Sequence, residues 1–108
     1  MARVLARGQV WTVRFRKPDK ERPVVILSRD EALEVLSTIL VAPITSTVRD
    51  LPSQVVVGEA EGLGHDSAIS LDHVQCLDRA RLIRRLGRLS PERMREVCAA
   101  LAVATGCA

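Results

Sequence analysis

Three consecutive hydroxyl side chains, Thr45, Ser46 and Thr47, follow a short apolar run at residues 39–42. Hydroxyl groups delivered by the end of a rigid strand can donate hydrogen bonds to phosphate oxygens. The same hydroxyls can instead form a turn in which they bind the local backbone. The hydroxyl run therefore predicts either a phosphate contact or a self-satisfied turn.

A single guanidinium, Arg22, stands directly before Pro23, where a charged stretch at residues 16–21 meets an apolar run. A residue that precedes proline is biased toward an extended backbone, which would hold the Arg22 side chain at a strand entrance. A guanidinium offers two parallel donors that match a phosphate group. Arg22 is accordingly a candidate phosphate ligand, with a solvated arginine at a strand end as the alternative.

The composition is compatible with an anionic partner. The chain has 108 residues and a net charge of +3, and fourteen of its sixteen basic residues are arginine. Arginine binds phosphate more specifically than lysine does, although a GC-rich genome produces the same bias. The length and the 47% apolar content predict one folded domain that spans residues 1–108.

The cysteines argue against a metal centre and against a disulfide framework. Cys76, Cys98 and Cys107 are odd in number and have no metal-ligand spacing, and the two histidines form no cluster with them. We therefore expect no metal and no other cofactor. No apolar run approaches the roughly 18 residues that cross a bilayer, and no signal peptide is evident. These features predict a cytoplasmic protein with no membrane association.

The hydrophobic pattern predicts several short strands that would carry these residues. Residues 9–15 alternate as a half-buried strand, in which Trp11 either packs in the core or stacks on a base, and residues 16–21 form an exposed hairpin loop. Further strands are expected at residues 24–28, 38–42, 54–58, 68–77 and 84–89. Pairing should stop or bulge at Pro43, and a bulge is expected near residues 72–73.

Three helical segments are expected beside these strands. Ser28 or Asp30 could cap a short helical turn, and Asp78 could cap another. The clearest helix follows Ser90 as N-cap, with Pro91 in its first turn and Gly106 as its stop. The pattern predicts a mainly β (α+β) fold, a small barrel with a C-terminal helix.

The order of these pieces resembles the MazF/PemK toxin family, which includes Kid. The matching segments are Arg7-Gly8-Gln9-Val10-Trp11, Arg22-Pro23-Val24-Val25-Ile26-Leu27-Ser28, Ala42-Pro43-Ile44-Thr45-Ser46, Leu51-Pro52, Gly62-Leu63, Asp66-Ser67, Asp72, Asp78, Arg81-Leu82 and Leu86-Gly87-Arg88-Leu89-Ser90-Pro91. The resemblance implies an SH3-like barrel of the CcdB/MazF type, a homodimer, and the toxin of a type II toxin–antitoxin system. It also implies metal-independent, sequence-specific cleavage of single-stranded mRNA and inhibition by a MazE-like antitoxin with an acidic tail.

The resemblance assigns roles to individual residues. It places the family's catalytic arginine and threonine at Arg22 and Thr45, and the carboxylate that some members use at Asp72. The implied reaction is attack by the RNA 2′-OH, which gives a 2′,3′-cyclic phosphate and a 5′-hydroxyl. Arg22 would stabilise charge, Thr45 would donate to the phosphate, and Asp72 would act as base, with His73 as a second candidate. The expected RNA-binding residues are Ser46, Arg16, Lys17, Lys20, His73 and Gln75.

The chain also departs from the family pattern. The family's Asp-Gln-x-Arg-Thr segment is replaced by Asp72-His73-Val74-Gln75-Cys76, and Ser70 stands where some members have arginine. The loop after the first strand is shorter, and a histidine that some members carry there is absent. These departures keep two alternatives open, namely a non-catalytic barrel that binds nucleic acid or an antitoxin, and a CcdB-like poison of a protein target.

Overall fold

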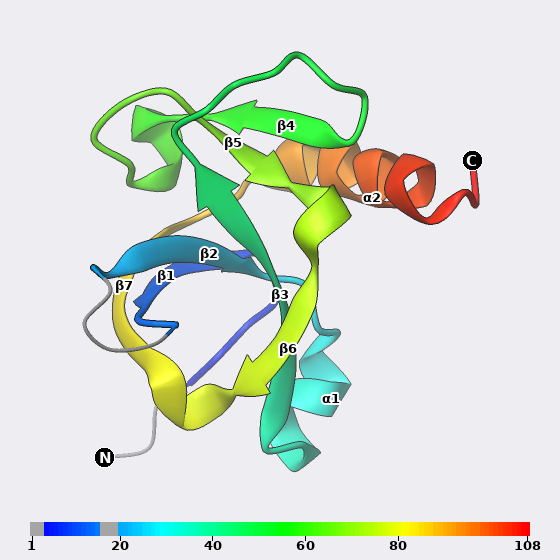
Figure 1. Cartoon of the computed structure of the whole chain (residues 1–108). Coiled ribbons are helices and arrows are strands. Elements are labelled where there is room, and N and C mark those ends of the chain that lie inside the picture. The colour runs from blue at the N-terminus through cyan, green and yellow to red at the C-terminus, as the bar shows by residue number, and fades with distance from the viewer. Residues whose placement is uncertain (1–3, 16–19) are drawn as a thin grey trace.

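The structure is a computed structural model, which describes residues 4–15 and 20–108. The described chain forms a curved, seven-stranded antiparallel sheet and a long C-terminal helix (Figure 1). The strands are β1 (Gln9–Val13), β2 (Arg22–Ile26), β3 (Thr38–Thr45), β4 (Gln54–Val57), β5 (Ser67–Ser70), β6 (Gln75–Asp78) and β7 (Leu82–Arg88). The helices are α1 (Asp30–Val35) and α2 (Pro91–Thr105), with 3-10 turns η1 (Glu59–Glu61), η2 (Leu71–His73) and η3 (Arg79–Arg81). The predicted mainly β fold with a terminal helix is confirmed.

β3 is the strand that joins the two halves of the sheet. The strand order is β4-β5-β3-β2-β1-β7, and β6 pairs with β3 outside this path. Figure 1 shows β4 and β5 near α2, with β1, β2 and β7 on the other side of β3. One core lies between the sheet and α2, which packs against β4 and η2. A second core lies on the opposite face and includes Leu33 of α1.

The prediction that the first strand is half-buried is wrong. All five residues of β1 are buried, because Val10 belongs to the core under α2 while Trp11 and Val13 belong to the second core. β1 also has a hydrogen-bonded neighbour on each side, β2 and β7. Trp11 is 7% exposed and its indole N–H donates to Gln9 at 2.9 Å, so it is a core residue.

The expected interruption of pairing at Pro43 is confirmed on both edges of β3. The ladder with β2 ends at Pro43, which is the last residue of the three pairs that join Val41, Ala42 and Pro43 to Ile26, Val25 and Val24. On the other edge the partner changes, from β6 at residues 38–41 to β5 at residues 44–45. A proline cannot donate to a ladder, so its position between two partner strands leaves no ladder bond missing there.

The bulge expected near residues 72–73 is wrong, since the predicted strand at residues 68–77 is two strands. β5 ends at Ser70, and the 3-10 turn η2 redirects the chain into β6. β5 then pairs with β4 and the end of β3, whereas β6 pairs with the beginning of β3. This break is what places Asp72 and His73 on a turn rather than on a strand.

The helix predictions hold at the C-terminus and need correction at α1. The Ser90 hydroxyl accepts from the Arg93 N–H at 3.2 Å, and Gly106 ends α2 with a left-handed φ of 75°. Asp78 accepts from the Ala80 N–H at 2.8 Å, as a cap of η3. The N-cap of α1, however, is Arg29, without a side-chain cap. Ser28 instead accepts from the Leu40 N–H, and Asp30 accepts from the Arg7 N–H, each at 2.8 Å.

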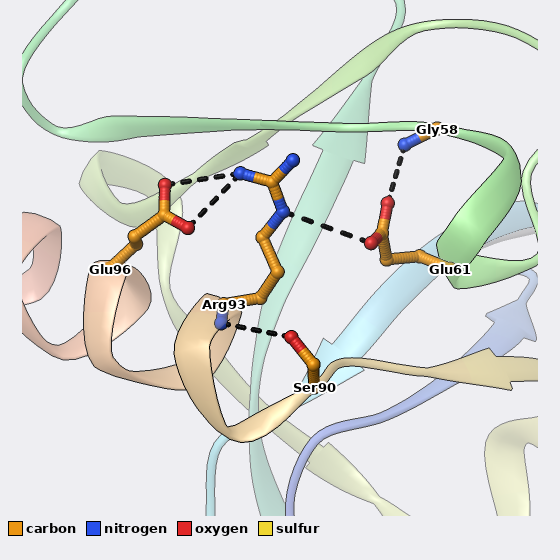
Figure 2. A network of polar contacts seen from close by, with 5 residues as sticks. All are labelled: Gly58, Glu61, Ser90, Arg93 and Glu96. Atoms are coloured by element: carbon orange, nitrogen blue, oxygen red, sulfur yellow. Dashed lines mark hydrogen bonds and ion pairs between the residues drawn. The ribbon is translucent and has the colours of Figure 1, made fainter.

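The segment between β4 and β5 is fixed by a buried carboxylate (Figure 2). Glu61 is 4% exposed, and its Oε1 accepts from the Gly58 N–H at 2.7 Å. Its Oε2 lies 3.8 Å from Nε of Arg93, whose Nη1 also binds both oxygens of Glu96 at 3.1 Å. This network connects η1 to α2 and so holds the chain that leads into β5.

Candidate active site

The sheet order brings three strand ends together. β2 and β5 lie on either side of β3 and are both antiparallel to it, so β2 begins, β3 ends and β5 begins at the same end of the sheet. Thr45 faces Ala68 of β5. The β2–β3 ladder ends at the Val24–Pro43 pair, so Arg22 and Thr45 each lie two residues beyond it, on β2 and β3 respectively. Residues far apart in the sequence therefore meet at one edge.

A cleft of about 520 Å³ opens at this sheet end. Its volume falls within the range of about 300–1,000 Å³ that is typical of ligand sites. It is lined by Lys20, Glu21, Arg22, Pro23, Pro43, Ile44, Thr45, Ser46, Leu63, Gly64, His65 and Ser67. The cleft thus brings together Arg22 and Thr45, and it also includes Lys20 and Ser46 from the predicted RNA-binding set.

Both central side chains have groups available for a phosphate. Arg22 is exposed, and within residues 4–15 and 20–108 no group pairs with its guanidinium. The Thr45 Oγ1 accepts from the Thr47 N–H at 3.1 Å, which leaves its own O–H free to donate. The two readings of the hydroxyl run are therefore compatible, because one hydroxyl can stabilise the turn and still contact a ligand.

A second, smaller hollow of about 300 Å³ shares Pro43 and Thr45 with the first cleft. It is lined by Pro43, Thr45, Thr47, Arg49, Leu51, Gln54, Ser70, Asp72 and His73. The Asp72 Oδ2 accepts from the Ser53 hydroxyl at 2.5 Å, and Nδ1 of His73 lies 2.7 Å from the Ser70 hydroxyl. Asp72 and His73 therefore share a hollow with Thr45, whereas Arg22 lines only the first cleft.

The remaining residues of the predicted RNA-binding set differ in their position relative to the two cavities. Gln75 is exposed on β6, where it faces Val41, and it lines neither cavity. Arg16 and Lys17 lie outside the described residues. Lys20, in contrast, stands just before β2 and reaches the first cleft.

His65 is a residue of the first cleft that the sequence reasoning missed. It lies in the connection between η1 and β5, and its backbone carbonyl accepts from the Ser67 hydroxyl at 3.3 Å. The local sequence identifies only a glycine-containing loop there. What places His65 in the same cleft as Arg22 is the pairing of β5 with the end of β3, which no local pattern encodes.

The described residues also bear on the expectations for disulfides, metal sites and membrane spans. Cys76, Cys98 and Cys107 are free and exposed. Within residues 4–15 and 20–108, no three His, Cys, Asp or Glu side chains are grouped so as to hold a metal ion. Neither helix in the described ranges combines the length and apolar character needed to span a bilayer.

Comparison with known proteins gives consistent matches along nearly the whole chain. The model of a family described as PemK-like, MazF-like toxin of type II toxin–antitoxin system matches residues 6–105. Probable endoribonuclease MazF5 of Mycobacterium tuberculosis is 44% identical over 108 residues, covering 99% of this chain and 98% of that protein. Probable endoribonuclease MazF2 from the same species is 33% identical over 104 residues, or 95% and 100% of the two chains.

Solved structures show the same fold. Mycobacterium tuberculosis toxin MazF-mt6 superposes with a TM-score of 0.85 at 32% identity, covering 93% of this chain and 98% of that one. An endoribonuclease in complex with its cognate antitoxin, from a mycobacterial species, gives a TM-score of 0.86 at 25% identity, covering 96% and 97%.

Proposed function

The chain belongs to the PemK-like, MazF-like toxins of type II toxin–antitoxin systems, and we propose that it is a metal-independent endoribonuclease that cuts single-stranded RNA. Relatives that match almost its full length are named endoribonucleases. The observation that carries the proposed site is the single cleft that contains both the Arg22 guanidinium and the Thr45 hydroxyl.

The chemistry uses the substrate's own nucleophile. The 2′-OH of RNA lies beside the scissile phosphate, so the protein must orient the two, stabilise charge on the phosphoryl oxygens and transfer protons. Arg22 donates to the phosphate through two parallel N–H groups, and Thr45 donates to another phosphoryl oxygen. Asp72 takes the 2′-OH proton from the hollow that it shares with Thr45. The products are a 2′,3′-cyclic phosphate and a 5′-hydroxyl.

The substrate is single-stranded because its unpaired bases can be splayed and read. Lys20 and Ser46 contact the RNA within the first cleft, and His73 contacts it within the second hollow. Arg16 and Lys17, which lie outside the described residues and precede Lys20 in the sequence, follow the RNA backbone in this proposal. Gln75, which is exposed on β6 and lines neither cavity, completes this RNA-binding set.

The partners in this proposal are an antitoxin and a second copy of the chain. A structural neighbour is described as an endoribonuclease in complex with its cognate antitoxin. Here Arg85 and Arg88 are exposed on β7, at the end of the sheet order, and suit a disordered acidic tail. Arg79 and Arg81 have a structural role, since they donate to backbone carbonyls of Leu33 and Arg14, each at 2.6 Å.

The test is to incubate the purified protein with a long RNA, with the same sequence as DNA, and with a supercoiled plasmid and topoisomerase. Cleavage of RNA alone, with cyclic phosphate ends, is the expected result. RNA binding without cleavage would instead support the non-catalytic barrel, and inhibition of the topoisomerase without RNA cleavage would support a poison of a protein target.

A further inference from the structure

The proposed reaction needs two proton transfers, and the first cleft contains three groups that can exchange protons. These are Lys20, Glu21 and His65. The Glu21 Oε1 accepts from the Thr12 hydroxyl at 2.8 Å and lies 3.8 Å from Nε of Arg84. A carboxyl group is ordinarily ionised near neutral pH, so it has no proton to give to a leaving group. An ammonium such as that of Lys20 ordinarily stays charged near neutral pH, whereas an imidazole ordinarily exchanges protons there.

We propose that His65 is the general acid that protonates the leaving 5′-oxygen, an inference that rests on the proposed RNA cleavage. In an in-line displacement the attacking and leaving oxygens lie on opposite sides of phosphorus. The proposed base, Asp72, lines the second hollow and His65 lines the first cleft, while Thr45 lines both. In this proposal a phosphate held by Arg22 and Thr45 receives the base from the second hollow and the acid from the first cleft.

The segment that carries His65 is held at both ends. Before it, Leu63 is buried in the core under α2, and its N–H donates to the Gly58 carbonyl at 3.2 Å. After it, Ser67 begins β5 and faces Val57 of β4. The His65 side chain itself is exposed at the cleft rim, which leaves it accessible to a substrate. A fixed backbone with an accessible imidazole suits a group that must meet a bound phosphodiester.

The proposed step is a transesterification at the scissile phosphate, with one proton removed and one proton supplied. The bond from the 2′-oxygen to phosphorus forms and the bond from phosphorus to the 5′-oxygen breaks. The 2′-OH proton passes to Asp72, and a proton on the His65 ring passes to the departing 5′-oxygen.

The experiment compares two substrates that differ only in the leaving atom. One is an RNA oligonucleotide that contains a mapped cut site, and the other carries sulfur in place of the bridging 5′-oxygen at that site. A thiolate leaves without being protonated, because a thiol is far more acidic than an alcohol. H65A should lose about 10²–10⁴-fold in single-turnover rate on the oxygen substrate and almost nothing on the sulfur substrate.

Two matched variants separate this role from a general loss. H73A removes the other histidine, which the proposal places at the RNA rather than at the leaving group, and it should slow both substrates by the same factor. R22A should also slow both substrates, since phosphate stabilisation is needed with either leaving atom. Added imidazole should partly restore H65A on the oxygen substrate, and H65Q, which occupies similar space, should behave as H65A does.

Each outcome decides the assignment. Equal slowing of both substrates by H65A, or no slowing of either, would overturn the role of His65 while leaving the proposed nuclease intact. Failure of the wild-type protein to cut either substrate would instead refute the proposed function, and the role of His65 with it. Matching thermal unfolding curves for H65A and wild type establish that a rate loss is chemical, and H65Q provides the comparison if H65A unfolds.

Discussion

Nε of Arg93 on α2 lies 3.8 Å from Oε2 of Glu61, a carboxylate that is almost fully buried. Figure 2 shows this contact, which joins the C-terminal helix to η1. From η1 the chain continues through Leu63 and His65 into β5. If a buried carboxylate loses its cationic partner, the free-energy cost of removing its charge from water remains and is no longer compensated. Helix α2 therefore supports one wall of the candidate active site.

Replacing Arg93 by alanine should destabilise the fold. R93A leaves the buried Glu61 without its cation, and we expect a loss of about 1–3 kcal/mol in the free energy of unfolding. Arg95 offers a matched control two residues away, because its 3.8 Å pair with Glu92 has both side chains 72% exposed. R95A should change stability by no more than about 0.5 kcal/mol. Urea denaturation measures both, and equal losses would contradict this role for Glu61.

Gly62 should tolerate no side chain. Its φ is +91°, and a Cβ atom there would lie 2.1 Å from the Leu86 carbonyl oxygen, a contact that only a shift of the backbone can relieve. G62A should therefore cost at least about 1–3 kcal/mol. The control is G64A, because a Cβ at Gly64 meets nothing within 4 Å. Thermal unfolding of the two variants should show a lower midpoint for G62A alone, and similar midpoints would show that the segment adapts.

Arg22 should be needed as a guanidinium and not only as a positive charge. R22A should reduce the cleavage rate by at least about 10²-fold through loss of transition-state stabilisation. R22K keeps the charge but lacks the planar fork, so it should recover only part of the activity. Single-turnover cleavage of an oligonucleotide with a mapped cut site measures both variants. Full activity in R22A would remove Arg22 from the site.

The hydroxyl of Thr45 should matter more than its shape. T45V keeps the volume but cannot donate to the phosphate, and we expect its rate to fall by about 10²–10³-fold. T45S keeps the O–H and should retain much of the activity. Because the Thr45 Oγ1 also accepts from the Thr47 N–H, the unfolding midpoint of each variant must be measured beside its rate. A T45V protein that is folded and fully active would exclude the proposed contact.

Cleavage should not depend on a divalent metal. The proposed chemistry uses the 2′-OH, Arg22 and Thr45, so excess EDTA should leave the rate within about twofold of its value without chelator, since no Lewis acid is required. An RNA with a single 2′-deoxy residue at the cut site should resist cleavage there while it is still cut at other sites. Loss of activity in EDTA that added magnesium restores would point to a metal-dependent enzyme.

Much of the fold could be read from short-range patterns. Ser90, Pro91 and Gly106 mark the ends of α2, because helix caps are set by residues within one turn. The strands were predicted from period-two alternation, and the errors occurred where the sheet order decides. The burial of β1 on both faces and the separation of β5 from β6 each depend on which strand lies alongside.

The sequence by itself determined which residues can do chemistry, since Arg22, Thr45 and Asp72 were identified from residue type, local context and family resemblance. Only the tertiary structure decided their neighbours. It brought Arg22 and Thr45 into one cleft, placed Asp72 in a second hollow that Thr45 also lines, and added His65 to the cleft. The physical reason is that caps and alternation act within a few residues, whereas a cleft is formed where β2, β3 and β5, distant along the chain, are hydrogen-bonded side by side.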